Sequence, residues 1–73
     1  MTLREMRENM VLNQLELSAL SKIPQSTISR WESGKSMPSA KYIRKLAEAM
    51  GIPPIEVRRA ALRSLEDAEA RSA

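Results

Sequence analysis

The amino-acid sequence contains no cysteine and no histidine, and its 73 residues include only one tryptophan and one tyrosine as aromatic residues. These absences exclude disulfides, zinc ribbons, thiol nucleophiles and imidazole bases. Carboxylates and amines remain as candidate catalytic groups, but no pair of them has a spacing that suggests catalysis. We therefore expect a protein that is not an enzyme and that needs no cofactor, no metal and no small-molecule ligand.

Long apolar runs are also missing. The longest one near the N-terminus is Met10 to Leu12, and it follows a segment crowded with charged side chains. Neither a signal peptide nor a membrane span has this composition. We expect a cytoplasmic protein with no membrane contact. A single domain of this length buries only about 60% of its unfolded surface, so a second subunit could add useful apolar burial.

The positive charge is concentrated in the middle of the chain. The net charge is +3, but residues 22–45 carry six basic side chains and one acidic one, whereas residues 60–73 carry two basic and three acidic side chains. A polyanion would bind around the basic segment. A merely solvated basic surface would have the same distribution, so charge alone does not decide between the two.

Two capping boxes mark the first two predicted helices. The pairs Thr2–Glu5 and Asn13–Glu16 have the spacing of a capping box and predict helices that begin at about residue 3 and at residue 14. The second of these should end near residue 21. The periodicity of the first predicts a core-facing side made of Leu3, Met6 and Met10.

Proline and glycine delimit the remaining helices. Pro24 opens a helix over 24–32 that Gly34 closes, and the next helix runs from a cap at Ser39 to Gly51 with a strong core stripe of Ile43, Leu46, Ala47 and Met50. A fifth helix should begin at residue 54 or 55 and fray past Leu65. The sequence thus predicts an all-α fold of five helices, with a domain over 1–58 and a C-terminal extension over 59–73.

The predicted helix over 24–32 has two different faces. One face carries Ile28 and Trp31, and the opposite face carries Gln25, Ser26, Ser29 and Arg30. Short polar groups, an amide and a guanidinium supply hydrogen-bond donors and acceptors with little bulk, which suits the reading of base edges in a groove. An ordinary amphipathic helix with a solvated outer face would show the same pattern.

The spacing Q-x-x-L-S-x-x-S-x-I-x-x-S-T-I-S-x-W-E-x-G-K over 14–35 resembles the Cro and phage-repressor class of helix-turn-helix domains, the XRE family. The resemblance extends over about residues 3–57 and includes Pro38, Ser39, Leu46, Ala47 and Gly51. It implies a five-helix, lambda-repressor-like domain whose second and third helices form the helix-turn-helix. It also implies binding to double-stranded DNA, with the helix over 24–32 in the major groove.

The resemblance assigns roles to matching residues. Base contacts would come from Gln25, Ser26, Ser29 and Arg30, with Gln25 suited to adenine and Arg30 to guanine. Contacts to the DNA backbone would come from Gln14, Thr27, Ser33, Lys35 and Lys41. Thr27 could instead contact a base methyl group or simply pack. Arg7 and Glu32 match two family positions that form a structural ion pair.

Several residues depart from the family's pattern. Lys22 stands where the family usually has glycine, and a left-handed backbone there would cost a residue with a Cβ about 1 kcal/mol, so we expect a turn that is either differently shaped or slightly strained. Pro24 stands where a side-chain cap is usual. Leu15 and Leu20 occupy positions that are normally polar, and they could be scattered surface residues or, like the C-terminal tail, contact a protein partner.

Proteins of this class pair two copies on half-sites about 34 Å apart, so we expect a homodimer on a palindromic operator. The predicted dimer surface consists of Ile52, Ile55, Val57, Leu62 and Leu65, although Leu62 and Leu65 could instead fold back onto their own domain. The function that follows is a sequence-specific transcriptional regulator, specifically a repressor. The alternative is a protein-interaction module such as an antitoxin or an adaptor.

Overall fold

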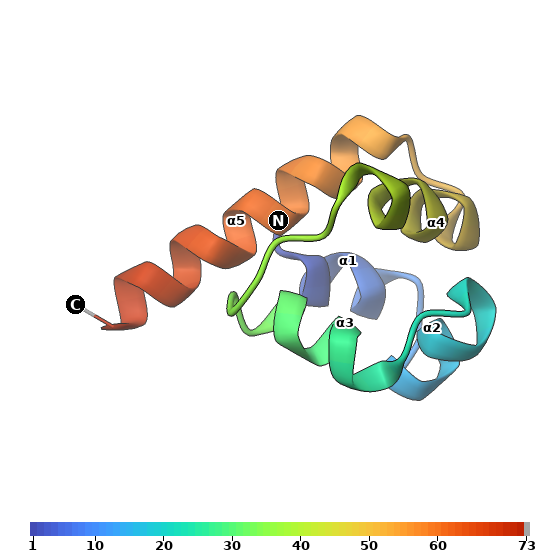
Figure 1. Cartoon of the computed structure of the whole chain (residues 1–73), viewed down its shortest axis with the longest axis horizontal. Helices are drawn as coiled ribbons and strands as arrows, with labels where there is room; N and C mark the ends of the chain where they lie inside the picture. Colours follow the sequence, from blue (N-terminus) through green and yellow to red (C-terminus); the bar gives the residue numbers. More distant parts are fainter. Residues whose placement is uncertain (73) are drawn as a thin grey trace.

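The five helices predicted from the sequence are all present in the computed structural model, which describes residues 1–72. No strand occurs in that range, so the all-α fold class is confirmed. Within the same residues, no helix is both long enough and apolar enough to span a bilayer. Figure 1 shows the order of the helices, which are α1 (Leu3–Asn9), α2 (Gln14–Ser21), α3 (Gln25–Glu32), α4 (Ala40–Met50) and α5 (Pro54–Ser72).

Both predicted capping boxes form. The hydroxyl oxygen of Thr2 accepts from the N–H of Glu5 at 3.2 Å, and the N–H of Thr2 donates to the Glu5 carboxylate at 2.8 Å. Asn13 and Glu16 make the same reciprocal pair at 2.7 and 2.9 Å. The Glu5 carboxylate accepts from the N–H of Thr2 and, at 3.1 Å, from its hydroxyl; both bonds favour the charged form, the backbone bond most of all, so the pKa of Glu5 is lowered from its usual value of 4.5.

The hydrophobic core consists of apolar side chains from one face of each helix. The predicted α4 stripe is buried, and so are Ile23 in the turn and Ile28 and Trp31 on α3. The Trp31 ring also packs against Tyr42 with a centroid distance of 5.4 Å. The prediction for Met10 was wrong, because α1 ends at Asn9 and leaves this side chain 42% exposed.

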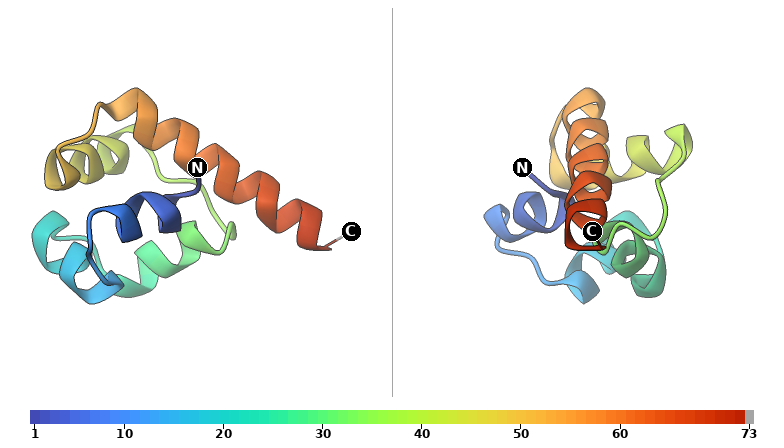
Figure 2. Two further views of the ribbon diagram at one scale, coloured as in Figure 1. Left: turned by 180° about the vertical axis from the view of Figure 1, so that it is seen from behind. Right: turned by 90° about the vertical axis from the view of Figure 1, so that its left-hand side faces the viewer.

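Small side chains bring α5 close to the rest of the domain. Ala60, Ala61 and Ser64 are buried, and Val57 is completely enclosed. The expected fraying past Leu65 was wrong, since α5 continues to Ser72. Figures 1 and 2 show its last turns projecting beyond the other four helices. Alanine, glutamate and arginine, which dominate this segment, all favour helix.

Candidate nucleic-acid interface

The turn between α2 and α3 fixes how the two helices cross. Lys22 adopts the left-handed conformation, with φ 59° and ψ 35°, where the family pattern has glycine. Ile23 then enters the core with 1% of its surface exposed, and its carbonyl accepts a hydrogen bond from the hydroxyl of Ser18 at 2.5 Å. The buried Ser21 is small enough for α3 to approach α2 closely. The turn is therefore held by packing on one side and by a hydrogen bond on the other.

The outer face of α3 is the most open polar surface of the helix-turn-helix. The four residues predicted to contact bases are all exposed, and none of their side chains is hydrogen-bonded to another part of the described chain: Gln25, Ser26, Ser29 and Arg30. The inner face is locked in the core by Ile28 and Trp31. This helix is thus rigidly seated while its outer donors and acceptors remain available.

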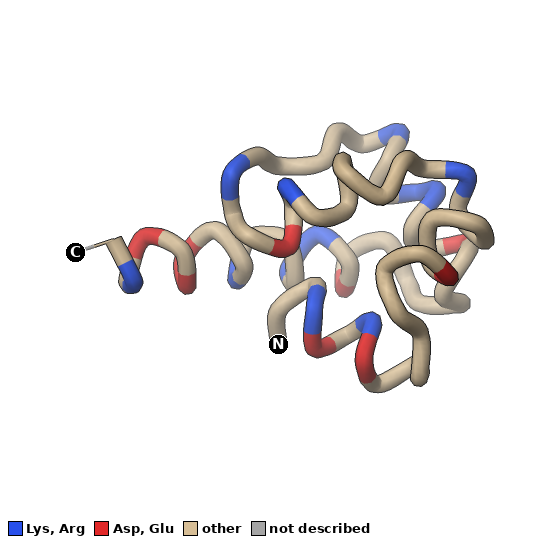
Figure 3. The backbone as a smooth tube through the Cα atoms, turned by 90° about the horizontal axis from the view of Figure 1, so that it is seen from below, with Lys and Arg blue, Asp and Glu red and all other residues tan. Residues whose placement is uncertain are grey.

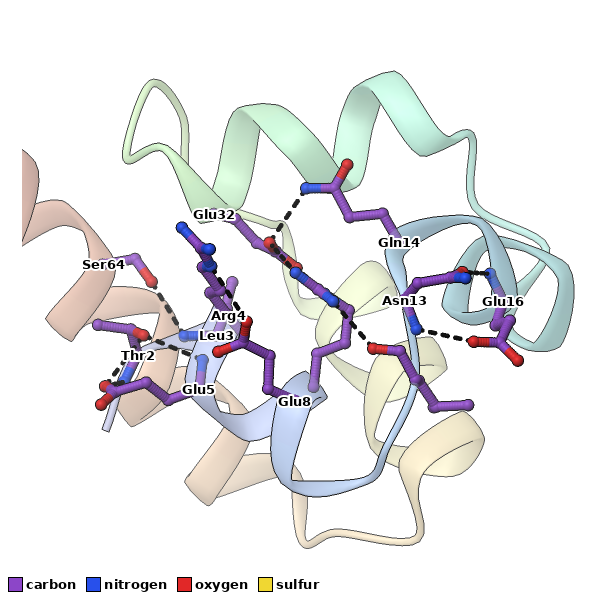
Figure 4. A network of polar contacts seen from close by, with 12 residues as sticks. Thr2, Leu3, Arg4, Glu5, Glu8, Asn13, Gln14, Glu16, Glu32 and Ser64 are labelled. Carbon is purple, nitrogen blue, oxygen red and sulfur yellow. Dashed lines mark hydrogen bonds and ion pairs between the residues drawn. The ribbon is translucent and has the colours of Figure 1, made fainter.

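An ion pair fastens the end of α3 to α1. Arg7 donates from Nε and Nη2 to the two carboxylate oxygens of Glu32, at 2.7 and 2.9 Å, and from Nη1 to the carbonyl of Leu12 at 2.9 Å (Figure 4). The two side chains are only 10% and 6% exposed. The hydrogen bond to Glu32 raises the pKa of Arg7, so the guanidinium stays charged despite its burial.

Gln14 joins this network, a contact that the sequence reasoning did not include. Its side-chain amide donates to Glu32 at 3.1 Å, although the two residues are 18 positions apart (Figure 4). The bond holds the side chain at the N-terminus of α2, where a helix end favours an anion. No local pattern could have indicated it, because the contact depends on how α2 and α3 pack.

The residues expected at the DNA backbone surround α3. Ser33, Lys35 and Lys41 are exposed, whereas Thr27 is half-buried. The right-hand view of Figure 2 places α3, the loop after it and the beginning of α4 on one side of the molecule, with α1 on the other. Figure 3 shows Lys and Arg positions along that same side. The structure thus places α3, the loop after it and the beginning of α4, which carry most of the predicted polar and basic residues, on one side of the molecule (Figure 2).

The apolar residues expected to contact partners separate into two groups. Val57 is fully buried in its own core, so it is not available to a partner, and Ile52 is half-buried against the same core. Ile55 and Leu62 are 51% and 43% exposed, and Leu65 is half-buried. Leu62 therefore does not fold back onto the domain. The remaining exposed leucines, on α2, are Leu15 at 64% and Leu20 at 58%.

A family model described as Helix-turn-helix matches residues 3–57. The match contains the whole of α1 to α4 and the first turn of α5, and so it includes every polar and basic residue placed on the surface described above. No significant match to a curated protein or to a solved structure was found.

Proposed function

The chain belongs to the XRE family of helix-turn-helix domains, a DNA-binding family, and from this premise we propose that it is a sequence-specific transcriptional regulator. The observation that carries the proposal is the outer face of α3, which is exposed, polar and free of internal hydrogen bonds. Since the family is one of DNA-binding regulators, we propose no enzymatic role. The protein would act in the cytoplasm, on the nucleoid.

Base reading would come from α3 in the major groove. Gln25 lies in the first turn and could donate to and accept from adenine through one amide. Arg30 lies near the other end and could make the bidentate contact that its guanidinium forms with guanine. Ser26 and Ser29 lie between Gln25 and Arg30, and their hydroxyls would contact base edges as donors or acceptors.

Backbone contacts would fix the protein's position on the duplex. Gln14 is already oriented by Glu32, and the second N–H of its amide could donate to a phosphate beside the N-terminus of α2. Lys35 and Lys41, on the loop after α3 and on α4, would grip the phosphates on the other flank, with Ser33 and Thr27 adding hydroxyl contacts. These contacts fix register without reading sequence.

The regulator would be a repressor that acts as a homodimer. One recognition helix reads only a few base pairs, so two copies on a palindromic operator, with half-sites about 34 Å apart, supply the specificity. The exposed Ile55 and Leu62, together with Leu65, support a partner surface on α5. A dimer of this size bound across a promoter would act by occlusion.

A second candidate function is a protein-interaction module such as an antitoxin or an adaptor. The observation that favours it is the exposure of Leu15 and Leu20 on α2, at 64% and 58%. Apolar side chains of this size at exposed positions of a helix fit a protein contact. The two functions can coexist in one chain, because these leucines lie outside the polar face of α3.

The experiment that tests the proposal is selection from a random duplex library, followed by titration of the enriched sequence at about 50 and 200 mM salt. We expect an enriched palindrome, and affinity that falls steeply with salt because lysine and arginine displace condensed counterions. Absence of binding, or equal binding to every duplex, would contradict the proposal and favour the interaction module.

A further inference from the structure

The outward side of α5 carries a stripe that its own domain leaves exposed except at the half-buried Leu65. Five of its residues follow the alternating three- and four-residue spacing of one helix face: Ile55, Arg58, Leu62, Leu65 and Glu69. Val57, Ala61 and Ser64, on the adjoining face of the helix, pack against the domain and are buried. We call these five residues, with Ser72 one further step along, the outer stripe. Its two leucines lie at the centre, and opposite charges lie on either side of them.

The charges of the outer stripe have no ionic partner within residues 1–72. Elsewhere on α5, Arg59 pairs with Glu56 at 2.9 Å and Arg63 pairs with Asp67 at 3.3 Å. Arg58 and Glu69 make no such pair in the described chain. The stripe therefore presents one unpaired cation before its apolar centre and one unpaired anion after it.

This arrangement is complementary to itself when two copies run antiparallel. If the twofold axis crosses α5 between residues 63 and 64, Leu62 faces Leu65 of the second copy. Arg58 then faces Glu69 of the second copy, and Ile55 faces Ser72. Ile55, Leu62 and Glu69 occupy the first position of successive heptads, and Arg58, Leu65 and Ser72 occupy the fourth. In an antiparallel helix pair, a first position of one helix faces a fourth position of the other. A parallel pair would instead place like charges opposite each other.

We propose that two copies of this chain pair through an antiparallel contact of their α5 helices, in the register that joins Arg58 to Glu69 of the second copy. The inference rests on the proposed homodimer and specifies the surface and register of that dimer. It also accounts for the projecting end of α5. An isolated last turn gains little in water, whereas a turn that lies along a second helix gains both packing and charge neutralisation.

A groove beside the stripe would receive the end of the second helix. It lies between α4 and α5, has a volume of about 300 Å³ and is lined by apolar side chains that include Ile43 and Ile55, with Arg44 and Arg58 as its basic groups. The end of α5 that would reach it carries Glu69 and Arg71, both exposed. In this register Glu69 is the one that faces the groove's Arg58, and the charges of these two side chains are opposite.

Charge-reversal variants test the register by sedimentation equilibrium of the full chain. In a homodimer of R58E, two glutamates face each other at each end of the stripe. In a homodimer of E69R, two arginines do so. Each variant alone should raise the dimer dissociation constant by about tenfold or more. Mixing the two variants restores an opposite-charge pair at both ends, so the mixture should form a heterodimer of nearly wild-type strength.

The matched control is R63E, which changes the charge of α5 by the same amount away from the outer stripe and should leave dimerisation within about twofold of wild type. Failure of the R58E and E69R mixture to recover would overturn the register, and a wild-type chain that stays monomeric would overturn the pairing altogether. Neither result touches DNA recognition, because selection from the duplex library reports on that separately.

Discussion

The backbone N–H of Leu3 donates a hydrogen bond to the hydroxyl of Ser64, at 3.0 Å and in a buried setting (Figure 4). The first N–H groups of a helix have no partner within that helix. Here the last helix of the chain supplies the missing acceptor for the first one. The same hydroxyl donates to the carbonyl of Ala60 at 3.1 Å, so it is fully used. Helices α1 and α5 are therefore joined by a polar contact as well as by apolar packing.

Replacing Ser64 with alanine should lower the free energy of unfolding by about 1 to 3 kcal/mol, since the N–H of Leu3 would remain buried without an acceptor. Chemical denaturation with urea measures the change. Ser72→Ala is the matched control, because that hydroxyl makes the equivalent bond to the carbonyl four residues earlier, but at an exposed position. Equal losses in the two variants would mean that the contact with Leu3 contributes nothing.

Arg7→Ala should destabilise the domain by about 3 kcal/mol or more, because it leaves the carboxylate of Glu32 buried without its cation. Arg4→Ala should change stability by less than about 1 kcal/mol, since the pair of Arg4 with Glu8 is exposed on the surface of α1. Thermal denaturation followed by circular dichroism compares the two. Similar melting temperatures would show that the buried pair does not hold α3 in place.

Gly34→Ala should be much more destabilising than Gly51→Ala. Both glycines have positive φ, 74° and 65°, so each substitution incurs the conformational cost of about 1 kcal/mol. A methyl group at Gly34 would also overlap the side chain of Ala68 and lie 2.7 Å from the carbonyl oxygen of Ser64, whereas the space at Gly51 is open. The difference between the two unfolding free energies therefore measures the steric contact alone, and a difference near zero would refute it.

The capping box at Thr2 should make the free energy of unfolding decrease at low pH. The folded pKa of Glu5 is lowered, chiefly by the backbone hydrogen bond from Thr2, so its contribution is fully present above the ordinary value of 4.5. It is lost as the pH falls through the lowered pKa of the folded state. Glu5→Gln should therefore flatten the fall of stability below about pH 4.5 relative to wild type. Superimposable acid titrations of stability for the two proteins would rule out this linkage.

Under the proposed function, Arg30→Ala should relax preference at one base position, at a cost of about 1 to 3 kcal/mol for the preferred base. Lys35→Ala should weaken binding to all sequences alike and reduce the salt slope by about 1. Selection and salt titration of both variants distinguish the two roles. A uniform loss in Arg30→Ala would place that side chain on the DNA backbone.

The sequence predicted those features that depend on neighbours within about four residues. The capping boxes, Gly34 and the α4 stripe are of this kind and were found where expected, whereas Pro24 is the N-cap of α3 rather than its first residue. The family pattern marked position 22 but left two shapes of the turn open, and Lys22 adopts the left-handed one. Local sequence thus indicates where helices begin and which face most of them bury, but the ends of α1 and α5 were predicted wrongly.

Contacts between segments that are distant in the sequence could not be predicted from neighbouring residues. Ser64 is 61 residues from Leu3, and Gln14 is 18 residues from Glu32, so neither pair has a sequence signature. The length of α5 was missed for another reason. The acidic, alanine-rich composition past Leu65 was taken as a sign of fraying, although the same residues have high helix propensity. Packing decides the distant contacts, whereas propensity alone could have predicted the full length of α5.

The close approach of Gly34 to Ser64 and Ala68 packs the end of α3 tightly against α5. A rotation of α5 would have to carry the end of α3 with it. In the proposed dimer, the distance between the two copies of α3 would then be constant. Such a protein would tolerate changes within each half-site better than the insertion or removal of a single base pair between them.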